Sequence, residues 1–384
     1  MSVEKKEAPR VYFEHLDVLR CIAALMVLCS HAFENAVGRY GFPLFMTKGD
    51  TNSLTFGGQY IYYIMRNGGF GVDVFLLISG FLITYLLLVE KSAKGKIHLG
   101  NFYIRRTLRI WPLYFFIMAL APFLVKWLET GMEPPYLMTA LFLNNFATIE
   151  SEYWVYPFAH FWSICVEEHF YLVWPFIIAF IPNRHLVKFF VFVILASIIS
   201  RGLFTHYGMG YYYQYLHTLS RMDSLAIGAI GAYFYHERPI RLQISSYYRW
   251  SAYLLFIAMF GYEAYNNYEG MFLACFRKYL YVGIVAFAML NFMFHEKPLI
   301  RFSKKNILHF LGKISYGLYM YGALMVIIID RKIMPMLPQP LNNFAVLLIL
   351  NLVLTFVVAF ISYHTLERFF MSLKTRFEVI KTRG

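Results

Sequence analysis

The segment Leu16–Phe33 places two chemically capable side chains inside a sequence that is apolar enough to enter a membrane. Arg20 and His31 lie eleven positions apart within it. Eleven residues at about 100° each bring a helix back to within about 20° of its starting direction, and a rise of about 1.5 Å per residue separates the pair by about 16 Å. One helix face would therefore present a guanidinium near one end and an imidazole near the other. Titratable groups inside a spanning helix are costly, which favours a functional role for this pair.

Each of these side chains also has a structural interpretation. Arg20 could extend to lipid headgroups beside Asp17, one turn earlier, and His31 could be a satisfied polar residue at a helix contact. Their shared face makes the functional interpretation the stronger one. An imidazole that titrates near neutrality can act as a general base, and an arginine can hold an anion or stabilise developing negative charge.

Three arginines form a second candidate site in the run F-Y-I-R-R-T-L-R-I-W-P-L-Y. Arg105, Arg106 and Arg109 are three or four positions apart, so they can share a helical face. Planar guanidinium groups bind phosphate oxygens through paired, charge-assisted hydrogen bonds. The positive-inside tendency of membrane proteins would also place basic residues here. Because the run contains no lysine and adjoins a helix start, we interpret it as a phosphate site.

The adjacent residues Glu167 and Glu168 are candidate acid or base groups. Neighbouring residues on a helix point about 100° apart, so the two cannot both face one cavity. We favour Glu167 as the catalytic carboxylate. Its helix face also carries Ser163, Tyr171 and Trp174.

Three further charged residues lie near the ends of apolar segments. Charged groups this close to hydrocarbon need partners, and the three residues are Asp73, Arg221 and Asp223. Structural ion pairing explains their presence as well as a catalytic role does. Pairing of Arg221 with a glutamate, or of His31 with Asp73 or Glu167, would satisfy this need.

Composition indicates the elements that must position these groups. Of 384 residues, 59% are hydrophobic and only 15% are charged, and the apolar residues gather in runs of about twenty. We predict an all-α integral membrane protein with about ten transmembrane helices. The predicted transmembrane spans are 16–33, 71–89, 109–126, 162–181, 188–204, 223–236, 250–265, 277–294, 314–331 and 344–364. The segment 136–147 is too short to span and is predicted to be re-entrant or interfacial.

The distribution of charge predicts the orientation. Most of the 35 Lys and Arg residues fall on the same side as the N-terminus, which the positive-inside rule makes cytoplasmic. Both termini are then cytoplasmic, as short tails at 1–15 and 366–384 of a single domain, 1–384. The first apolar segment is expected to be an uncleaved anchor.

The net charge of +13 does not indicate nucleic-acid binding in such a protein, and no metal-ligand spacing predicts a metal site.

The pair Arg20 and His31, separated by ten residues, resembles the first-helix motif of the membrane acyltransferase-3 family. The similarity continues through G-V-D-V-F-L-L-I-S-G-F-L-I-T, I-R-R-T-L-R-I-W-P-L-Y, W-S-I-C-V-E-E-H-F-Y-L-V-W-P, R-M-D-S-L-A-I-G, L-G-K-I-S-Y-G-L-Y-M-Y and S-Y-H-T-L-E-R-F. Two positions depart from the family pattern: Gly322 stands where relatives commonly have histidine, and Phe369 where they have proline. The hydrolase-like domain fused to some relatives is expected to be absent.

The resemblance implies an O-acyltransferase that takes an acyl group, usually acetyl, from cytoplasmic acyl-coenzyme A. The acyl group would pass to a hydroxyl of a saccharide or another glycosylated acceptor. The resemblance implies that Arg20 and His31 are the essential pair and that Arg105, Arg106 and Arg109 lie where the coenzyme's phosphates would bind. The expected partners are acyl-coenzyme A as cosubstrate, a carbohydrate or glycolipid acceptor and the lipid bilayer, with no permanently bound cofactor. The expected location is a bacterial cytoplasmic (inner) membrane.

Two alternatives remain at this point. In the simplest mechanism neutral His31 takes the proton of the acceptor hydroxyl as it attacks the thioester, whereas a covalent route would briefly acylate His31 or a nearby hydroxyl. The rival function is a multipass transporter or flippase of a polar or anionic solute. Inverted repeats and matching broken helices would support that function, and neither is visible in the sequence.

Overall fold

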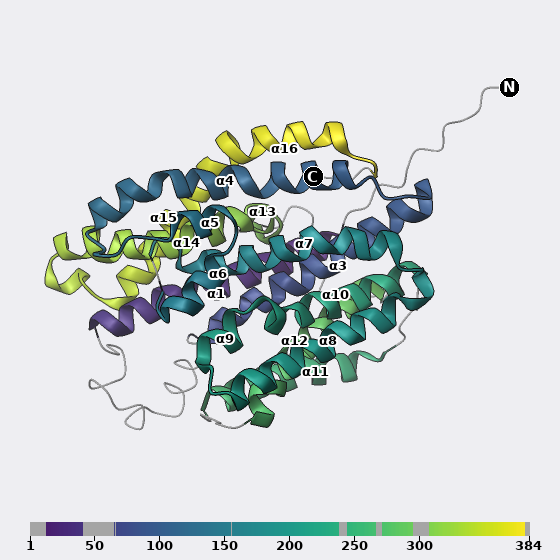
Figure 1. Cartoon of the computed structure of the whole chain (residues 1–384). Coiled ribbons are helices and arrows are strands. Elements are labelled where there is room, and N and C mark those ends of the chain that lie inside the picture. The colour runs from purple at the N-terminus through teal and green to yellow at the C-terminus, as the bar shows by residue number, and fades with distance from the viewer. Residues whose placement is uncertain are drawn as a thin grey trace.

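The computed structural model describes residues 13–40, 65, 67–154, 156–237, 244–265, 271–294 and 307–380. Within these ranges the secondary structure is helical and contains no β-strand, as the apolar runs predict. Figure 1 shows long helices packed side by side, with short helices at their ends. The long helices are α1 (Glu14–Tyr40), α3 (Gly71–Lys94), α4 (Leu99–Leu128), α7 (Trp162–Phe180), α8 (Asn183–His206), α10 (Thr218–Glu237), α11 (Ser246–Tyr265), α12 (Met271–Phe294), α14 (Ser315–Ile328) and α15 (Phe344–Ser362).

All ten predicted spans fall on helices, and six described stretches are long and apolar enough to cross a bilayer. These six are His15–Ala36, Asn67–Lys94, Leu99–Leu128, Ala159–Phe180, Asn183–His206 and Phe344–Phe377. A seventh would combine α13 (Ile307–Lys313) with the stretch Ser315–Met336, which is bent from it by 75°. The helical character of the ten segments is therefore confirmed, whereas the number of ten spans and the cytoplasmic position of both termini stay predictions.

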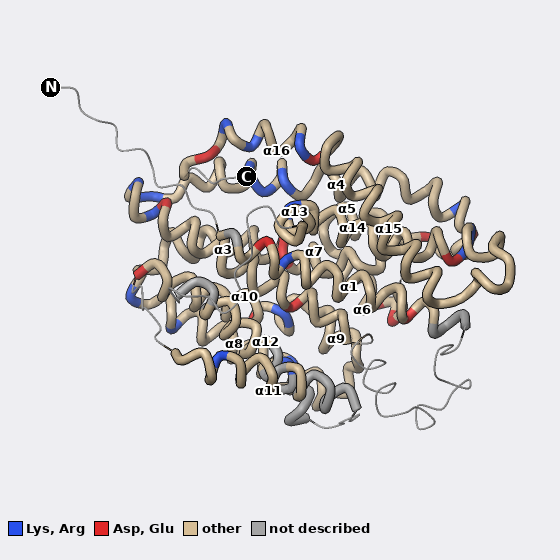
Figure 2. The backbone as a smooth tube through the Cα atoms, turned by 180° about the vertical axis from the view of Figure 1, so that it is seen from behind, with Lys and Arg blue, Asp and Glu red and all other residues tan. Residues whose placement is uncertain are grey.

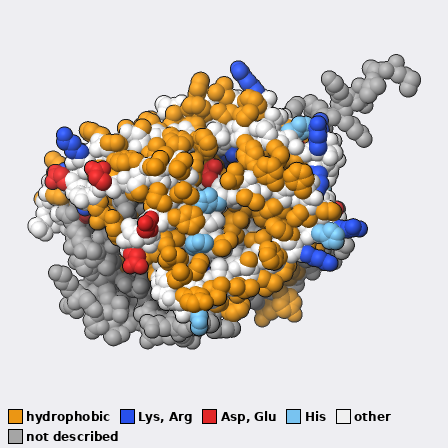
Figure 3. All heavy atoms as spheres, in the orientation of Figure 1, with side chains coloured by type: hydrophobic (Ala, Val, Ile, Leu, Met, Phe, Trp, Pro, Cys, Tyr) orange, Lys and Arg blue, Asp and Glu red, His pale blue; other side chains and the backbone are white. Residues whose placement is uncertain are grey.

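The outer surface of the bundle agrees with a position in lipid. Large apolar side chains on α4, α7 and α8 point outward, and Phe123, Leu172, Phe180 and Phe192 are each more than 60% exposed. Figure 3 shows hydrophobic side chains spread over most of one face, with most charged groups toward its margins and a few near the middle. A soluble protein rarely exposes apolar patches of this extent. The long apolar helices and this surface identify an integral membrane protein.

Close packing of α3 against α10 depends on two glycines. A side chain at Gly80 would clash with the backbone oxygen of Leu225, and one at Gly228 would clash with the backbone oxygen of Leu77. Small residues allow two helix backbones to approach each other in a membrane, where van der Waals contact replaces the hydrophobic effect as the main attraction. This contact fixes the helices that carry Asp73 and Arg221.

Two segments outside the long helices differ from simple loops. Residues 136–147 contain α5 (Tyr136–Ala140) and the start of α6 (Asn144–Ser151), which are too short to cross a bilayer; a re-entrant or interfacial position for them stays a prediction.

After α15 the chain continues through a π-helical turn, Tyr363–Glu367, into α16 (Arg368–Lys374). Figure 1 shows α16 lying along α4. The segment predicted as a C-terminal tail therefore packs on the bundle as far as the structure describes it, whereas most of the predicted tail 1–15 lies outside the described residues.

Candidate functional site

A partly open cavity gathers most of the candidate residues. It has a volume of about 220 Å³ and lies between α1, α3, α4, α7 and the part of the chain from α13 to α16. Figure 2 shows Lys and Arg concentrated on α16 and the neighbouring part of α4. Positive charge exceeds negative charge around the cavity, which therefore favours an anionic ligand. The cations that border it are Arg20, Arg106, Arg109, Lys313 and Lys374, and the carboxylates are Asp17 and Glu167.

Arg20 lies on the cavity wall that α1 forms. Its guanidinium Nη1 is 3.5 Å from Asp17 Oδ1, the partner that the structural interpretation of the sequence assigned to it. Gly312 of α13 packs so closely on α1 that a side chain there would clash with the backbone oxygen of Asp17. This approach encloses α1 at the level of Arg20, and only 18% of the arginine side chain is exposed. Arg20 is thus held inside the protein and faces the cavity.

The two adjacent glutamates have different surroundings, as their separation of about 100° on a helix predicts. Glu167 borders the cavity, and its carboxylate oxygens accept hydrogen bonds of 2.8 Å from Ser79 Oγ and Tyr171 Oη. Glu168 lies toward Trp111, whose indole Nε1 donates to it across 3.4 Å. The helix face chosen for Glu167 from the sequence is therefore the face that meets the cavity.

Two of the three arginines that were predicted to bind phosphate border the cavity. These are Arg106 and Arg109 on α4. Arg105 instead donates to Glu90 Oε2 at 3.3 Å and to the backbone oxygen of Phe377 at 2.8 Å. This contact holds the C-terminal segment against α4. The structure therefore gives Arg105 a structural partner on each side, while phosphate binding by Arg106 and Arg109 stays a prediction.

Two cations of the cavity escaped the sequence reasoning. Lys313 ends α13 within the family-like run L-G-K-I-S-Y, and Lys374 ends α16, in the segment predicted as a tail. Packing of α16 along α4 brings Lys374 into electrostatic range of Arg106 and Arg109. The basic character of the C-terminal segment was visible in the sequence, but its return to α4 was not.

His31 is not among the residues that border the cavity. It lies farther along α1 and is partly exposed. His160, which the sequence reasoning did not single out, belongs to the 3-10 turn Ala159–Phe161 that leads into α7. Its backbone oxygen accepts hydrogen bonds from Ser163 and Tyr319, which both border the cavity. The backbone of His160 is therefore hydrogen-bonded to two residues of the cavity wall.

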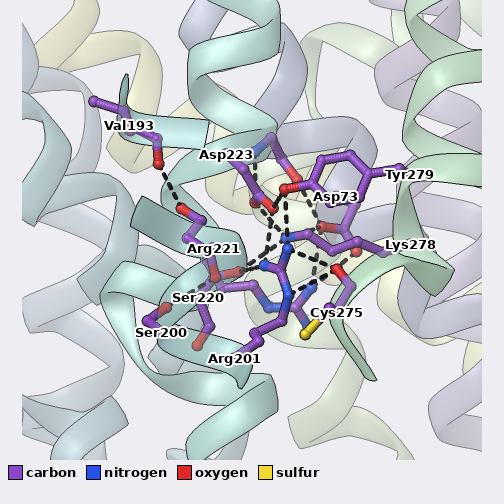
Figure 4. A network of polar contacts seen from close by, with 12 residues as sticks. Asp73, Val193, Ser200, Arg201, Ser220, Arg221, Asp223, Cys275, Lys278 and Tyr279 are labelled. Atoms are coloured by element: carbon purple, nitrogen blue, oxygen red, sulfur yellow. Dashed lines mark hydrogen bonds and ion pairs between the residues drawn. The ribbon is translucent and has the colours of Figure 1, made fainter. Parts of the chain in front are cut away.

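A separate network of buried charges joins α3, α8, α10 and α12 (Figure 4). Arg221 Nη1 lies 3.0 Å from both carboxylate oxygens of Asp73. Arg201 Nη1 lies 2.8 Å from Asp223 Oδ2, and Lys278 contacts Asp223 as well as Asp73. All five side chains are at most 15% exposed. Because each of these charges contacts an opposite charge from another helix, the network supports the structural interpretation of Asp73, Arg221 and Asp223.

The ion partners proposed from the sequence are partly wrong. Arg221 pairs with Asp73 and not with a glutamate, because the glycine contacts between α3 and α10 bring these two residues together. Asp73 is occupied by Arg221, and Glu167 by two hydroxyl groups, so neither carboxylate serves as the ion partner of His31.

Replacing Asp223 by asparagine is expected to lower the stability of the folded protein by about 3–5 kcal/mol, because Arg201 and Lys278 would remain buried without their carboxylate. The melting temperature in detergent should fall accordingly. The control is Glu129→Gln, which removes a carboxylate that is 81% exposed from its pair with Lys332 and should change stability by less than about 1 kcal/mol. Equal melting temperatures for Asp223→Asn and the wild type would contradict a structural role for the network.

Comparison with known proteins agrees with the family suggested by the first-helix motif. A family model described as an acyltransferase domain matches residues 13–364. The O-acetyltransferase OatA of Staphylococcus aureus is 27% identical in an alignment of 338 residues, which covers 81% of this chain and 54% of OatA. A putative O-acetyltransferase of the same species, SACOL0978, is 29% identical over 295 residues, covering 69% of this chain and 48% of that protein.

This chain thus spans about half the length of the curated relatives that it matches. No solved structure matches it. The family model nevertheless covers most of the chain, including the α1 face, the arginines of α4 and the C-terminal segment as far as residue 364. The protein therefore belongs to the acyltransferase-3 family and carries its acyltransferase domain.

Proposed function

We propose that this protein transfers an acyl group, acetyl in the simplest case, from cytoplasmic acyl-coenzyme A to a hydroxyl of a saccharide or glycolipid acceptor at the membrane. The observation that carries the proposal is the cationic cavity, in which five Lys and Arg side chains face two carboxylates. Coenzyme A carries several phosphate groups, the kind of anion that guanidinium groups bind best. The O-acetyltransferase names of the S. aureus relatives support acetyl as the transferred group.

The size of the cavity suggests how the donor would be held. About 220 Å³ is below the range of roughly 300–1,000 Å³ that is usual for pockets enclosing a whole ligand, so the cavity would take only part of acyl-coenzyme A. Its phosphates would lie against Arg106, Arg109 and Lys374. The thioester arm would extend along α3 toward Ser163 and Tyr319, which border the same cavity.

In the proposed mechanism His31 is the general base. Its neutral imidazole would take the proton of the acceptor hydroxyl as the oxygen attacks the thioester carbonyl, and the thiol of coenzyme A would leave. On the covalent route, Arg20 would stabilise the negative charge that develops on the thioester oxygen as the acyl group leaves coenzyme A in the cavity. Glu167, held by Ser79 and Tyr171, would offset part of the positive charge and keep Arg20 in place. Because His31 does not border the cavity, the acyl group would have to move from the donor toward His31, either directly or after a covalent stop on a hydroxyl of the cavity wall such as Ser163 or Tyr319.

The deciding experiment measures thiol release from acetyl-coenzyme A by the purified protein in detergent or vesicles, with and without a membrane fraction that supplies acceptors. Release that depends on the protein, with acetyl appearing on a glycan by mass, supports the proposal. Movement of a labelled solute across vesicles without any thiol release would instead favour the transporter alternative.

The reaction is expected to need no metal ion. Within the part of the chain that the structure describes, no group of three or more His, Cys, Asp or Glu side chains is arranged to hold one, and charge stabilisation can come from Arg20. Thiol release should therefore be unchanged after incubation with EDTA. Activity that disappears with the chelator and returns with one divalent ion would contradict this prediction.

A further inference from the structure

The cavity follows one face of α3 over more than half of that helix. The residues that border it recur at helical spacing from Val72 through Phe75, Ser79 and Leu82 to Leu86. The fourteen-residue step from Val72 to Leu86 corresponds to about 21 Å at a rise of about 1.5 Å per residue. A volume of about 220 Å³ that extends over such a length describes a narrow channel.

Most of the cations lie toward one end of this channel. The helix α4 begins shortly after α3 ends, so Arg106 and Arg109 lie toward the Leu86 end. Lys374 joins them there, because α16 packs along α4. Coenzyme A carries its phosphates at one end of the molecule and its acyl thioester at the other. Phosphates bound by these cations would therefore place the acyl group toward the Val72 end.

Close helix contacts end the channel beyond Val72. A side chain at Gly71 of α3 would clash with the backbone oxygen of Ala23 on α1. A side chain at Gly322 of α14 would clash with the side chain of Leu28, also on α1. The helix α1 therefore packs directly against both α3 and α14 at this level, which closes the gaps between α1 and these two helices.

Two aromatic rings meet at the closed end of the channel. Phe75 of α3 and Tyr319 of α14 both border the cavity, and their rings pack edge to face with centroids 5.9 Å apart. The Tyr319 ring is held in place, because its Oη donates to the backbone oxygen of His160 at 2.9 Å and lies 2.6 Å from Ser163 Oγ. Phe75 thus packs against an anchored ring and not against an open space.

Arg20 lies at about the same level as Phe75. The helices α1 and α3 run in opposite directions, and Gly71 contacts Ala23. Phe75 is about one turn beyond Gly71, Arg20 is about one turn before Ala23, and both side chains border the cavity. A thioester oxygen that faces Arg20 would therefore leave its acyl group beside the Phe75 ring.

We propose that Phe75, supported by Tyr319, limits the length of the acyl group that the protein transfers. Each methylene added to an acetyl group would have to displace the Phe75 ring from its contact with Tyr319, and overfilling of a packed apolar site is unfavourable. One methylene typically changes discrimination by about 10- to 200-fold in a hydrophobic pocket. This inference rests on the proposed acyl transfer, and it assigns short-chain acyl-coenzyme A as the donor class.

The test measures thiol release from acetyl-, propionyl-, butyryl- and hexanoyl-coenzyme A and compares kcat/KM between donors within each protein. Such a ratio does not depend on the fraction of protein that is folded. In the wild type, kcat/KM should fall at least about tenfold from acetyl- to butyryl-coenzyme A. In Phe75→Ala, the ratio of butyryl to acetyl should rise at least about tenfold above the wild-type ratio, because removal of the ring lengthens the compartment. Phe75→Leu, which removes less of the packing, should show a smaller rise.

The matched control is Phe190→Leu on α8. Phe190 is fully buried, stacks on Trp174 at 5.1 Å and is not among the residues that border the cavity. This control should keep the wild-type ratio of the donors. Wild-type ratios in both Phe75 variants would overturn the proposal, and so would an equal rise in Phe190→Leu or a wild type that uses butyryl- as well as acetyl-coenzyme A. Absence of thiol release from every donor by the wild type would instead refute the proposed function itself.

Discussion

Replacing His31 by alanine is expected to abolish acyl transfer in a protein that still folds and still binds acyl-coenzyme A. A general base typically contributes about 10²- to 10⁴-fold to the rate, so the loss in turnover should be plain. Donor binding should survive because His31 does not border the cationic cavity. Folding should survive because removal of a polar group from a spanning helix lowers its insertion cost, although the small cavity left behind offsets part of this gain.

The measurement is turnover per correctly folded molecule, with folding checked by thermal unfolding in detergent. The matched control is His236→Ala, which removes an imidazole that contacts Ser92 and Glu237 at the end of α10 and is not among the residues that border the cavity. This control should keep its turnover. If His31→Ala keeps near-normal turnover and only loses yield or melting temperature, His31 has a structural role and not the catalytic one.

Replacing Arg106 and Arg109 together by glutamine is expected to weaken the binding of acyl-coenzyme A by about 10²- to 10⁴-fold. Each hydrogen bond to a charged group contributes about 1.5–3 kcal/mol, and both arginines border the cavity in which the phosphates would lie. Acceptor affinity should change much less, because the proposed acceptor reaches the site from the side of His31. Isothermal titration with acetyl-coenzyme A, or its KM, measures the effect.

Arg105→Gln provides the comparison within the same cluster. Since Arg105 is engaged with Glu90 and with the backbone of Phe377, its loss should lower the melting temperature and affect donor affinity less than either neighbour. A triple variant in which Arg105, Arg106 and Arg109 are all replaced by glutamine should therefore resemble the double variant in donor affinity. Unchanged affinity in the double variant would remove these arginines from the donor site.

The positions of the helices could be predicted from the sequence because a long apolar run in a membrane protein has few alternatives to a helix. Their relation to the bilayer could not be predicted as fully. The helix α10 carries Arg221 and Asp223, and these charges are tolerated because α3, α8 and α12 supply partners. Hydropathy along the chain contains no information about such partners. Hydropathy alone therefore does not give the number of spans where charged residues are buried.

Partners from distant parts of the chain were also what local sequence patterns could not predict in the candidate site. Local helix geometry correctly predicted that Glu167 and Glu168 do not face the same cavity, since a separation of about 100° depends on nothing outside the helix. The helix face with Ser163 and Tyr171 then correctly favoured Glu167 as the residue that borders the cavity. Local helix geometry could not separate Arg105 from Arg106, because the partners of Arg105 come from residue 90 and from the end of the chain. Lys374 was missed for the same reason.

The glycine contacts between α3 and α10 have a consequence for motion. Backbones that approach so closely, and that are also joined by the ion pair of Asp73 with Arg221, cannot slide past each other without a clash. We therefore expect this pair of helices to behave as the static part of the molecule.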